Sequence, residues 1–168
     1  MHDTNTASPY DPVMVADVEK AIREYLPQVI HLSLATASED RPWICEVHFV
    51  FDEQLNLYFR SLPSRRHSRE IEANARVAGN IVAQHAIGQK ERGVSFEGRA
   101  ELLVNVGADH VAYRLYCERF GTDEAILDEA ATEDGHKFYK ITVETFYLFD
   151  RVESTPSRKY ELAWPRRI

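Results

Sequence analysis

Hydroxyl and cationic side chains crowd one short segment of this acidic chain, which contains Arg60, Ser61, Ser64, Arg65, Arg66, His67 and Arg69. The segment predicts a short helix over residues 64–74 with Ser64 as its N-cap, so the arginines would stand in the first turn. Unpaired backbone N–H groups and the positive end of the helix dipole favour an anion there. Because guanidinium groups match phosphate oxygens in a bidentate way, the segment predicts a phosphate-binding turn.

The same arginines allow a second interpretation. Cations at the start of a helix are unfavourable because of the helix dipole, and a bound anion is one explanation for their presence there. Glu70 and Glu72 are expected on the outer side of this helix, with Ile71 facing inward, so the two carboxylates could instead pair with the arginines. From the residues alone, a phosphate site and a solvated cluster of ion pairs both remain open.

The segment that begins at Arg92 is a weaker candidate for a site. Gly93 would let the backbone approach a ligand closely at the start of a strand, and Gly98 would mark a bulge or a packing gap. An ordinary edge strand with a glycine bulge explains the same residues, so both interpretations stand.

Cysteine and histidine residues give still weaker signals. Cys45 falls in the apolar stripe of a predicted strand, which is typical of a buried core thiol rather than a nucleophile. The seven histidines lack the paired spacing of metal ligands, and His48 faces away from that stripe, near Glu46. We therefore predict no metal site, and no side chain is singled out as a catalytic acid or base.

Two periodicities predict the elements that would position these residues. Apolar residues at helical spacing predict helices over residues 12–26, 64–74, 108–120 and 123–132. Alternation with a period of two predicts strands over residues 30–35, 43–51, 57–61, 77–84, 93–104 and 137–149. Six strands with short connections predict a mainly β (α+β) fold, a split antiparallel six-stranded β-barrel with short flanking helices.

Length and composition restrict the class of protein. A chain of 168 residues predicts one domain, here residues 11–168, behind a flexible leader at residues 1–10 and with a mostly irregular tail over residues 150–168. The net charge of −7 disfavours a general nucleic-acid binder, which needs a basic surface to replace counterions on phosphates. Two cysteines, no signal-peptide pattern and no apolar run of membrane-spanning length indicate a cytoplasmic protein with free thiols and no membrane partner.

Several short motifs together match a known pattern. Arg65-Arg66-His67 is similar to a Ser-Arg-Lys phosphate turn, and Arg92-Gly93-Val94 is similar to an Arg-Gln-Val strand start. This pattern resembles the pyridoxamine 5′-phosphate oxidase-like, FMN-binding split-barrel superfamily over about residues 29 to 104. A bacterial branch of that superfamily, of unassigned activity, is more similar still. The residues shared with it are Trp43, Cys45, Phe49, Phe51, Asp52, Arg66, His67, Val77, Ala78, Gly79 and Phe96, with Lys159 and Trp164 in the tail.

The resemblance implies that FMN is the cofactor and that the protein is a homodimer with the flavin at the interface. Arg66 would be the main phosphate ligand, and Arg65 and His67 would stand where the oxidase has serine and lysine. The residues implied along the isoalloxazine ring are Cys45, Glu46, Val47 and His48. The remaining residues of the implied cofactor site are Arg60, Ser61 and Arg92, with Lys159 and Trp164 reaching the flavin from the partner subunit.

The resemblance favours an FMN-dependent oxidoreductase acting on a small molecule, and it leaves other functions open. The alternatives are a non-enzymatic flavin-binding or redox-sensing dimer, a haem- or deazaflavin-binding member of the fold, and a structural dimeric barrel without a cofactor. The oxidase's basic residue on its second strand is not evident in residues 45–50, and its substrate-phosphate residues are not recognisable in residues 150–168. Vitamin B6 is therefore not predicted as the substrate.

Overall fold

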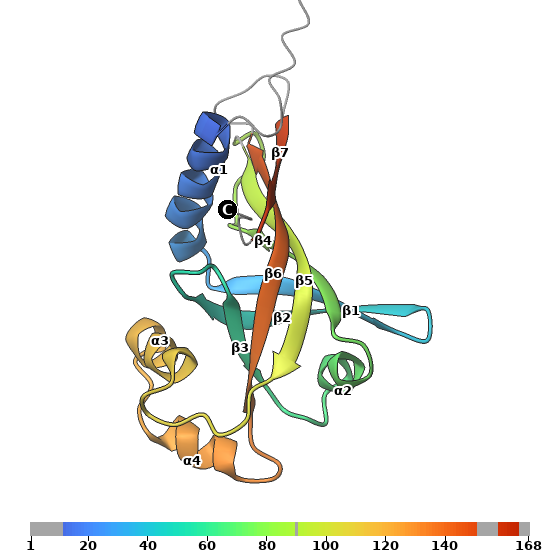
Figure 1. The fold of residues 1–168 in the computed structure, drawn as a ribbon, viewed down its shortest axis with the longest axis vertical. Coiled ribbons are helices and arrows are strands. Elements are labelled where there is room, and N and C mark those ends of the chain that lie inside the picture. The colour runs from blue at the N-terminus through green and yellow to red at the C-terminus, as the bar shows by residue number, and fades with distance from the viewer. Residues whose placement is uncertain (1–11, 90, 151–157, 165–168) are drawn as a thin grey trace, which may run out of the picture.

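The computed structural model describes residues 12–89, 91–150 and 158–164 (Figure 1). Its helices are α1 (Pro12–Tyr25), the 3-10 turn η1 (Leu26–Gln28), α2 (Arg66–Ala73), α3 (Val111–Phe120) and α4 (Ala125–Ala131). Its strands are β1 (His31–Ser38), β2 (Arg41–Phe51), β3 (Leu57–Ser61), β4 (Arg76–Val82), β5 (Arg92–Leu102), β6 (Lys137–Asp150) and β7 (Arg158–Ala163).

The strands form one antiparallel sheet that closes on itself. Their order is β3-β2-β1-β4-β5-β6-β7, and an additional pairing of β3 with β6 closes β1 to β6 into a six-stranded barrel. The predicted fold class is therefore confirmed, with β7 as an extra strand paired to the second half of β6. The barrel is split because β3 pairs with only residues 49–51 of β2, while β1 pairs with β2 over residues 41–48.

Alternation along the strands fills the barrel interior. Phe49, Phe59 and Phe96 are nearly or fully buried together with the leucines and isoleucines of the neighbouring strands. Helix α1 adds its apolar face, including the fully buried Ile22, to the same cluster. Because burial of a phenylalanine or leucine side chain contributes about 1.5–3 kcal/mol, this cluster is the main source of stability for the barrel.

A second apolar cluster lies outside the barrel, where the segment between β5 and β6 folds back over β2 and β3. It consists of Val50, Tyr58, Ala112, Tyr116, Ile126 and Phe138. Val50 is 2% exposed although alternation puts it on the face opposite the barrel stripe, because α3 and α4 cover that face. Gly121 ends α3 in the left-handed conformation, with a φ of 64°.

Glycine at position 98 meets a packing requirement of the barrel. The register between β5 and β6 shifts between Glu97 and Gly98, in agreement with a bulge, which was one of the two interpretations of this glycine. A Cβ atom at Gly98 would lie 2.3 Å from the carbonyl oxygen of Thr142 and 2.9 Å from the Cα of Val143. The two strands can approach this closely because the position has no side chain.

Three local predictions are wrong. Residues 158–163 form β7 rather than irregular tail, because they pair with residues 145–150 of β6 and bury Leu162. The N-cap of α2 is Arg65 rather than Ser64, because the backbone N–H of Arg65 still bonds to Leu62 in the preceding turn. Glu70 is 8% exposed rather than outward-facing, because it packs toward β1.

Two predictions concern the chain as a whole. The proposed leader at residues 1–10 lies outside the described residues. Among those described, no helix has the length and apolar character needed to cross a membrane.

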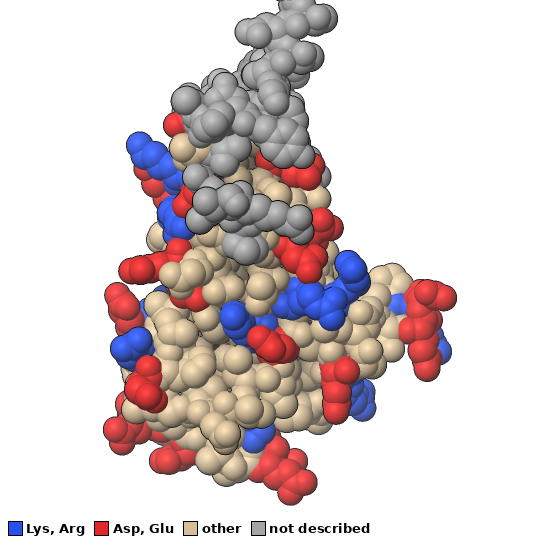
Figure 2. Space-filling view, in the orientation of Figure 1, with Lys and Arg blue, Asp and Glu red and all other residues tan. Residues whose placement is uncertain are grey.

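On the face shown in Figure 2, acidic and basic side chains alternate in small groups around a broad uncharged area.

Candidate functional site

A pocket of about 860 Å³ opens where the barrel is split. One wall is the half of β2 that β3 leaves unpaired, the second is the end of β3 with the start of α2, and the third is the segment that carries α3 and α4. Nine of the residues implied at the cofactor site line it: Cys45, Glu46, Val47, His48, Arg60, Ser61, Arg65, Arg66 and His67. The structure thus brings together two segments that the resemblance assigned to opposite ends of one ligand.

The β2 wall presents backbone hydrogen-bonding groups. The N–H of Phe49 bonds to the carbonyl of Ile30 on the β1 side, at 3.2 Å. Successive residues of a strand direct these groups to opposite edges, so those of His48 and Glu46 are directed away from β1, toward the pocket. The hydroxyl of Tyr116 donates to the carbonyl of His48 at 2.9 Å, which leaves the edge at Glu46 as the open part.

The start of α2 forms the second wall and favours an anion. Arg65, the N-cap, has an extended backbone, and no side chain caps the helix. The first backbone N–H groups of a helix have no intrahelical acceptor, so those of Arg66 and the next two residues are available at this end. The first turn contains no acidic residue. Backbone dipole and side-chain charge therefore have the same sign here.

The two arginines of the turn differ in their surroundings. The Arg65 side chain makes no hydrogen bond or ion pair with any described residue, and it lines the pocket. Arg66 donates from Nε to Oε1 of Glu70 at 2.7 Å, and its guanidinium carbon lies 4.5 Å from the ring centre of Trp43. The predicted pairing with Glu70 is thus present, but it engages only one edge of one guanidinium.

Ser61 and His67 are bonded to each other rather than directed freely into the pocket. Nε2 of His67 lies 2.6 Å from Oγ of Ser61, and Ser68 donates to the same oxygen at 3.2 Å. Burial, together with the nearby charge of Arg65, lowers the pKa of His67, so its ring is uncharged at neutral pH. His67 therefore does not supply the cation that lysine supplies at the equivalent place in the oxidase.

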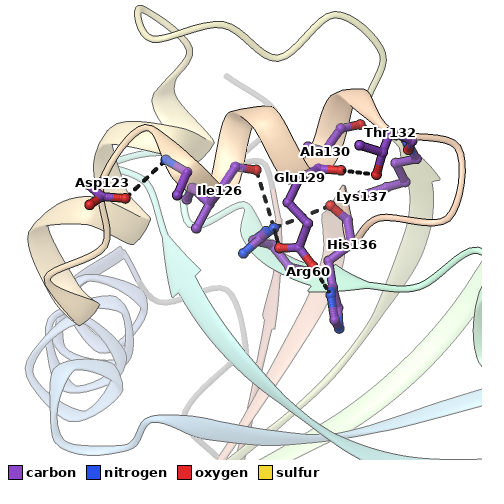
Figure 3. A network of polar contacts seen from close by, with 9 residues as sticks. Arg60, Asp123, Ile126, Glu129, Ala130, Thr132, His136 and Lys137 are labelled. Atoms are coloured by element: carbon purple, nitrogen blue, oxygen red, sulfur yellow. Dashed lines mark hydrogen bonds and ion pairs between the residues drawn. The ribbon is translucent and has the colours of Figure 1, made fainter.

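Arg60 belongs to a charged cluster in the third wall (Figure 3). Its Nη2 lies 2.6 Å from Oε2 of Glu129, and Nδ1 of His136 lies 2.6 Å from the other carboxylate oxygen. Hydrogen bonds from His136 and Arg60 lower the pKa of Glu129 to about 2. Among the described residues, Nε of Arg60 is the one buried side-chain N or O atom without a hydrogen-bond partner. Arg60, on β3, therefore connects this strand to α4 through its ion pair with Glu129.

The side chains of β2 give the pocket a mixed character. Burial, followed by the charges of Glu46 and Glu70, raises the pKa of the Cys45 thiol to about 11, so a thiolate nucleophile is disfavoured at neutral pH. His48 stacks on His31 of β1 at 4.4 Å between ring centres and lies 5.4 Å from the ring centre of Phe120. Flat, partly apolar walls of this kind suit a planar ligand.

Three of the implied residues lie away from this pocket in the same chain. Arg92 begins β5, where its carbonyl accepts from the hydroxyl of Tyr25 at 2.8 Å. Lys159 belongs to β7, where it pairs with Phe149. Strand β7 lies at the end of the molecule opposite α2 and α3 (Figure 1). The indole N–H of Trp164 donates to the carbonyl of Gln54 at 2.6 Å. Contacts of the last two with a partner's flavin stay a prediction.

Several residues that line the pocket were not assigned to the cofactor site from the sequence, although Trp43 was among the residues shared with the bacterial branch. They are Trp43, Leu62, Tyr116, Phe120, Thr122, Glu129 and His136. Tyr116 and Phe120 carried a signal, since two aromatic residues four apart share one face of a helix. Glu129 and His136 carried none, because their place depends on how α4 folds back onto β3.

Comparison with known proteins agrees with the fold. A UPF0306 protein of Photorhabdus laumondii is 29% identical over 106 residues, which cover 62% of this chain and 73% of that protein. The heme storage protein HutZ of Vibrio cholerae superimposes with a TM-score of 0.59 at 22% identity, over 75% of this chain and 89% of HutZ. A FAD-binding protein of Mesorhizobium loti superimposes with a TM-score of 0.55 at 21% identity, over 76% of this chain and 89% of that protein.

At such identities the solved structures establish the fold alone. A family model described as pyridoxamine 5′-phosphate oxidase matches residues 18–150, from α1 to the end of β6. This match spans the whole six-stranded barrel and the segment that covers it. The chain belongs to the pyridoxamine 5′-phosphate oxidase family.

Proposed function

We propose that the chain binds FMN in the pocket at the split of the barrel and is a flavin-dependent oxidoreductase acting on a small molecule. The observation that carries the proposal is the meeting of two unlike walls in one pocket: the basic, uncapped start of α2 and the open backbone edge of β2. Each wall suits one end of a flavin nucleotide. Membership of the family supports the same assignment.

The phosphate would lie at the start of α2. Arg65 and the Nη groups of Arg66 supply charged donors, and the first backbone N–H groups of the helix supply neutral ones. Neither the hydroxyl of Ser61 nor the ring of His67 is needed, because these two groups bond to each other. The donor set fits a phosphate monoester without any rearrangement of buried groups.

The isoalloxazine ring would lie along β2. Its polar edge has donors and acceptors that can pair with the backbone at Glu46, and its faces are apolar, like the walls at Val47 and Phe120. A bound flavin supplies hydride and one-electron chemistry, while the protein binds, orients and shields it. The lowered pKa of Glu129 disfavours a role as a proton donor, and the raised pKa of Cys45 disfavours a role as a nucleophile. The chain would therefore act mainly by positioning the flavin.

A second copy of the chain would complete the site, as in the homodimer implied by the resemblance. Trp43 and Ile44 expose 41% and 63% of their surface beside the pocket. Exposed large apolar residues grouped in this way favour a covered surface. Size-exclusion chromatography with light scattering should give the mass of two chains, and the mass of one chain at micromolar concentration would contradict the dimer.

The absorption spectrum of the purified protein tests the proposal first. We expect a flavin spectrum, either as isolated or after addition of FMN, and bleaching of the bound flavin by an electron donor such as NADH or NADPH without oxygen. A sharp Soret band would instead indicate haem. A colourless protein that FMN fails to reconstitute would refute flavin binding.

An Arg66→Ala variant tests the placement of the phosphate. Loss of a charged hydrogen-bonding partner should weaken FMN binding by about 1.5–3 kcal/mol. Arg69→Ala is the matched control, because Arg69 is an exposed arginine of the same helix that does not line the pocket. Unchanged FMN affinity in Arg66→Ala would place the phosphate elsewhere.

A further inference from the structure

One arginine of the phosphate turn is held by a buried carboxylate. Arg66 is the first residue of α2 and Glu70 lies one turn later, with Nε and Oε1 2.7 Å apart. The Arg66 side chain is 41% exposed, whereas that of Glu70 is only 9% exposed. Exposed ion pairs at this spacing contribute little. A buried partner is different, because the carboxylate cannot turn to water and stays where the fold places it.

The other oxygen of this carboxylate is bonded to the barrel. Thr36, on β1, is 2% exposed and donates from Oγ1 to Oε2 of Glu70 at 2.5 Å. The hydrogen bond from Thr36, followed by that from Arg66, lowers the pKa of Glu70. The carboxylate is thus ionised at neutral pH and anchored at both oxygens, to the rigid sheet on one side and to the guanidinium on the other.

The guanidinium is held on its edge and on its face. Glu70 engages Nε, and the indole of Trp43 lies 4.5 Å below the guanidinium carbon. Among the described residues the Nη groups make no hydrogen bond or ion pair, and the side chain lines the pocket. An arginine side chain loses rotamer freedom when it binds a ligand, so fixing it beforehand reduces the cost of binding.

We propose that Glu70, anchored by Thr36, is a positioning residue that presents the two Nη groups of Arg66 to the phosphate of the flavin. This inference rests on the proposed function and deepens it, since it makes Glu70 a determinant of selection for the phosphorylated cofactor. The competing explanation is that Glu70 merely neutralises Arg66. The two differ in sign: removing a positioning partner weakens phosphate binding, and removing a neutralising charge strengthens it.

The experiment compares the dissociation constants of FMN and riboflavin in Glu70→Gln, a change that keeps size and removes charge. We expect FMN to bind about tenfold more weakly, which corresponds to about 1.4 kcal/mol, with riboflavin unchanged. A general loss of structure would weaken both ligands alike. Glu72→Gln is the control, because Glu72 is an exposed carboxylate of the same helix. In an Arg66→Ala background, Glu70→Gln should cause no further change in the ratio of the two constants.

Thr36→Val provides a second variant if Glu70→Gln does not fold, and it should reduce the preference for FMN in the same direction. The fluorescence of Trp43, measured without ligand in a Trp164→Phe background, reports the guanidinium directly, since the chain has two tryptophans. Tighter FMN binding in Glu70→Gln, or an unchanged ratio with unchanged Trp43 fluorescence, overturns the positioning role. Absence of flavin binding in the wild type would refute the proposed function. If Trp43 fluorescence still responds to Glu70→Gln in that case, the placement of Arg66 by Glu70 stands.

Discussion

The carboxylate of Glu129 is expected to stabilise the fold, and Glu129→Gln is the perturbation that tests this. Glu129 bonds to Arg60 at 2.6 Å on one oxygen and to His136 at 2.6 Å on the other (Figure 3). The Arg60 side chain is 13% exposed. In Glu129→Gln an amide oxygen could still accept from Arg60, and its other acceptors are the carbonyls of Ile126 and His136, at 3.3 and 3.4 Å, but none of these groups is charged. A largely buried cation would thus lose its counter-charge.

The size of the effect follows from the pKa of Glu129, which falls from an ordinary 4.5 to about 2. A difference of 2.5 multiplied by about 1.36 kcal/mol gives an upper limit of about 3.4 kcal/mol. The Glu129 side chain is 41% exposed, so solvent screening reduces the contribution to about 1–2 kcal/mol. We expect Glu129→Gln to lower the free energy of unfolding at pH 7 by that amount.

The pH dependence has a definite sign. The pKa is lower in the folded than in the unfolded state, so the contribution is complete above about pH 4.5 and is lost as the pH falls toward 2. Urea unfolding curves of wild type and Glu129→Gln should therefore differ at pH 7 and converge near pH 2. Glu133→Gln, an exposed carboxylate just after α4, should match the wild type throughout. Equal stability of Glu129→Gln and wild type at pH 7, or a gap that persists at pH 2, would refute this reasoning.

Three further outcomes are expected. Gly98→Ala should lower the free energy of unfolding by about 1–3 kcal/mol, because the new Cβ would meet the carbonyl of Thr142, and wild-type stability in urea unfolding would contradict this. Tyr58→Phe should cost about 1.5 kcal/mol by thermal unfolding, since Tyr58 donates to the buried carboxylate of Asp52 at 2.7 Å, and an unchanged midpoint would count against it. In a Cys117→Ser background, alkylation of Cys45 should be slow at pH 8 and rise about tenfold per pH unit toward pH 11, whereas a plateau below pH 9 would disagree with the burial of this thiol.

The strands and the phosphate turn could be predicted because their signals are local. Alternation with a period of two located β3 at residues 57–61, the same bounds that the structure has. The cluster of cations around the start of α2 was evident from the sequence alone, without any tertiary information. β7 was missed because six residues with weak alternation form a strand only by pairing with β6, and that contact is not local.

The composition of the site was harder to predict because it depends on contacts between distant segments. Glu70 was expected to face solvent. Instead it packs against β1, where it accepts a hydrogen bond from Thr36, 34 positions earlier in the chain. Likewise, Glu129 and His136 reach the pocket only because α4 folds back onto Arg60. Helical periodicity assigns faces relative to the nearest apolar residues, and it carries no information on such partners.

Phosphorus NMR of FMN bound to the wild-type protein tests most directly whether the start of α2 binds the phosphate. A phosphate monoester releases its second proton near pH 6 in water. Held by Arg65, Arg66 and the start of α2, the bound phosphate should stay dianionic to lower pH than free FMN, and Arg66→Ala should return its titration toward that of the free cofactor. A bound flavin whose phosphorus resonance titrates like that of free FMN would show that its phosphate lies in solvent, and would contradict the assignment of this turn.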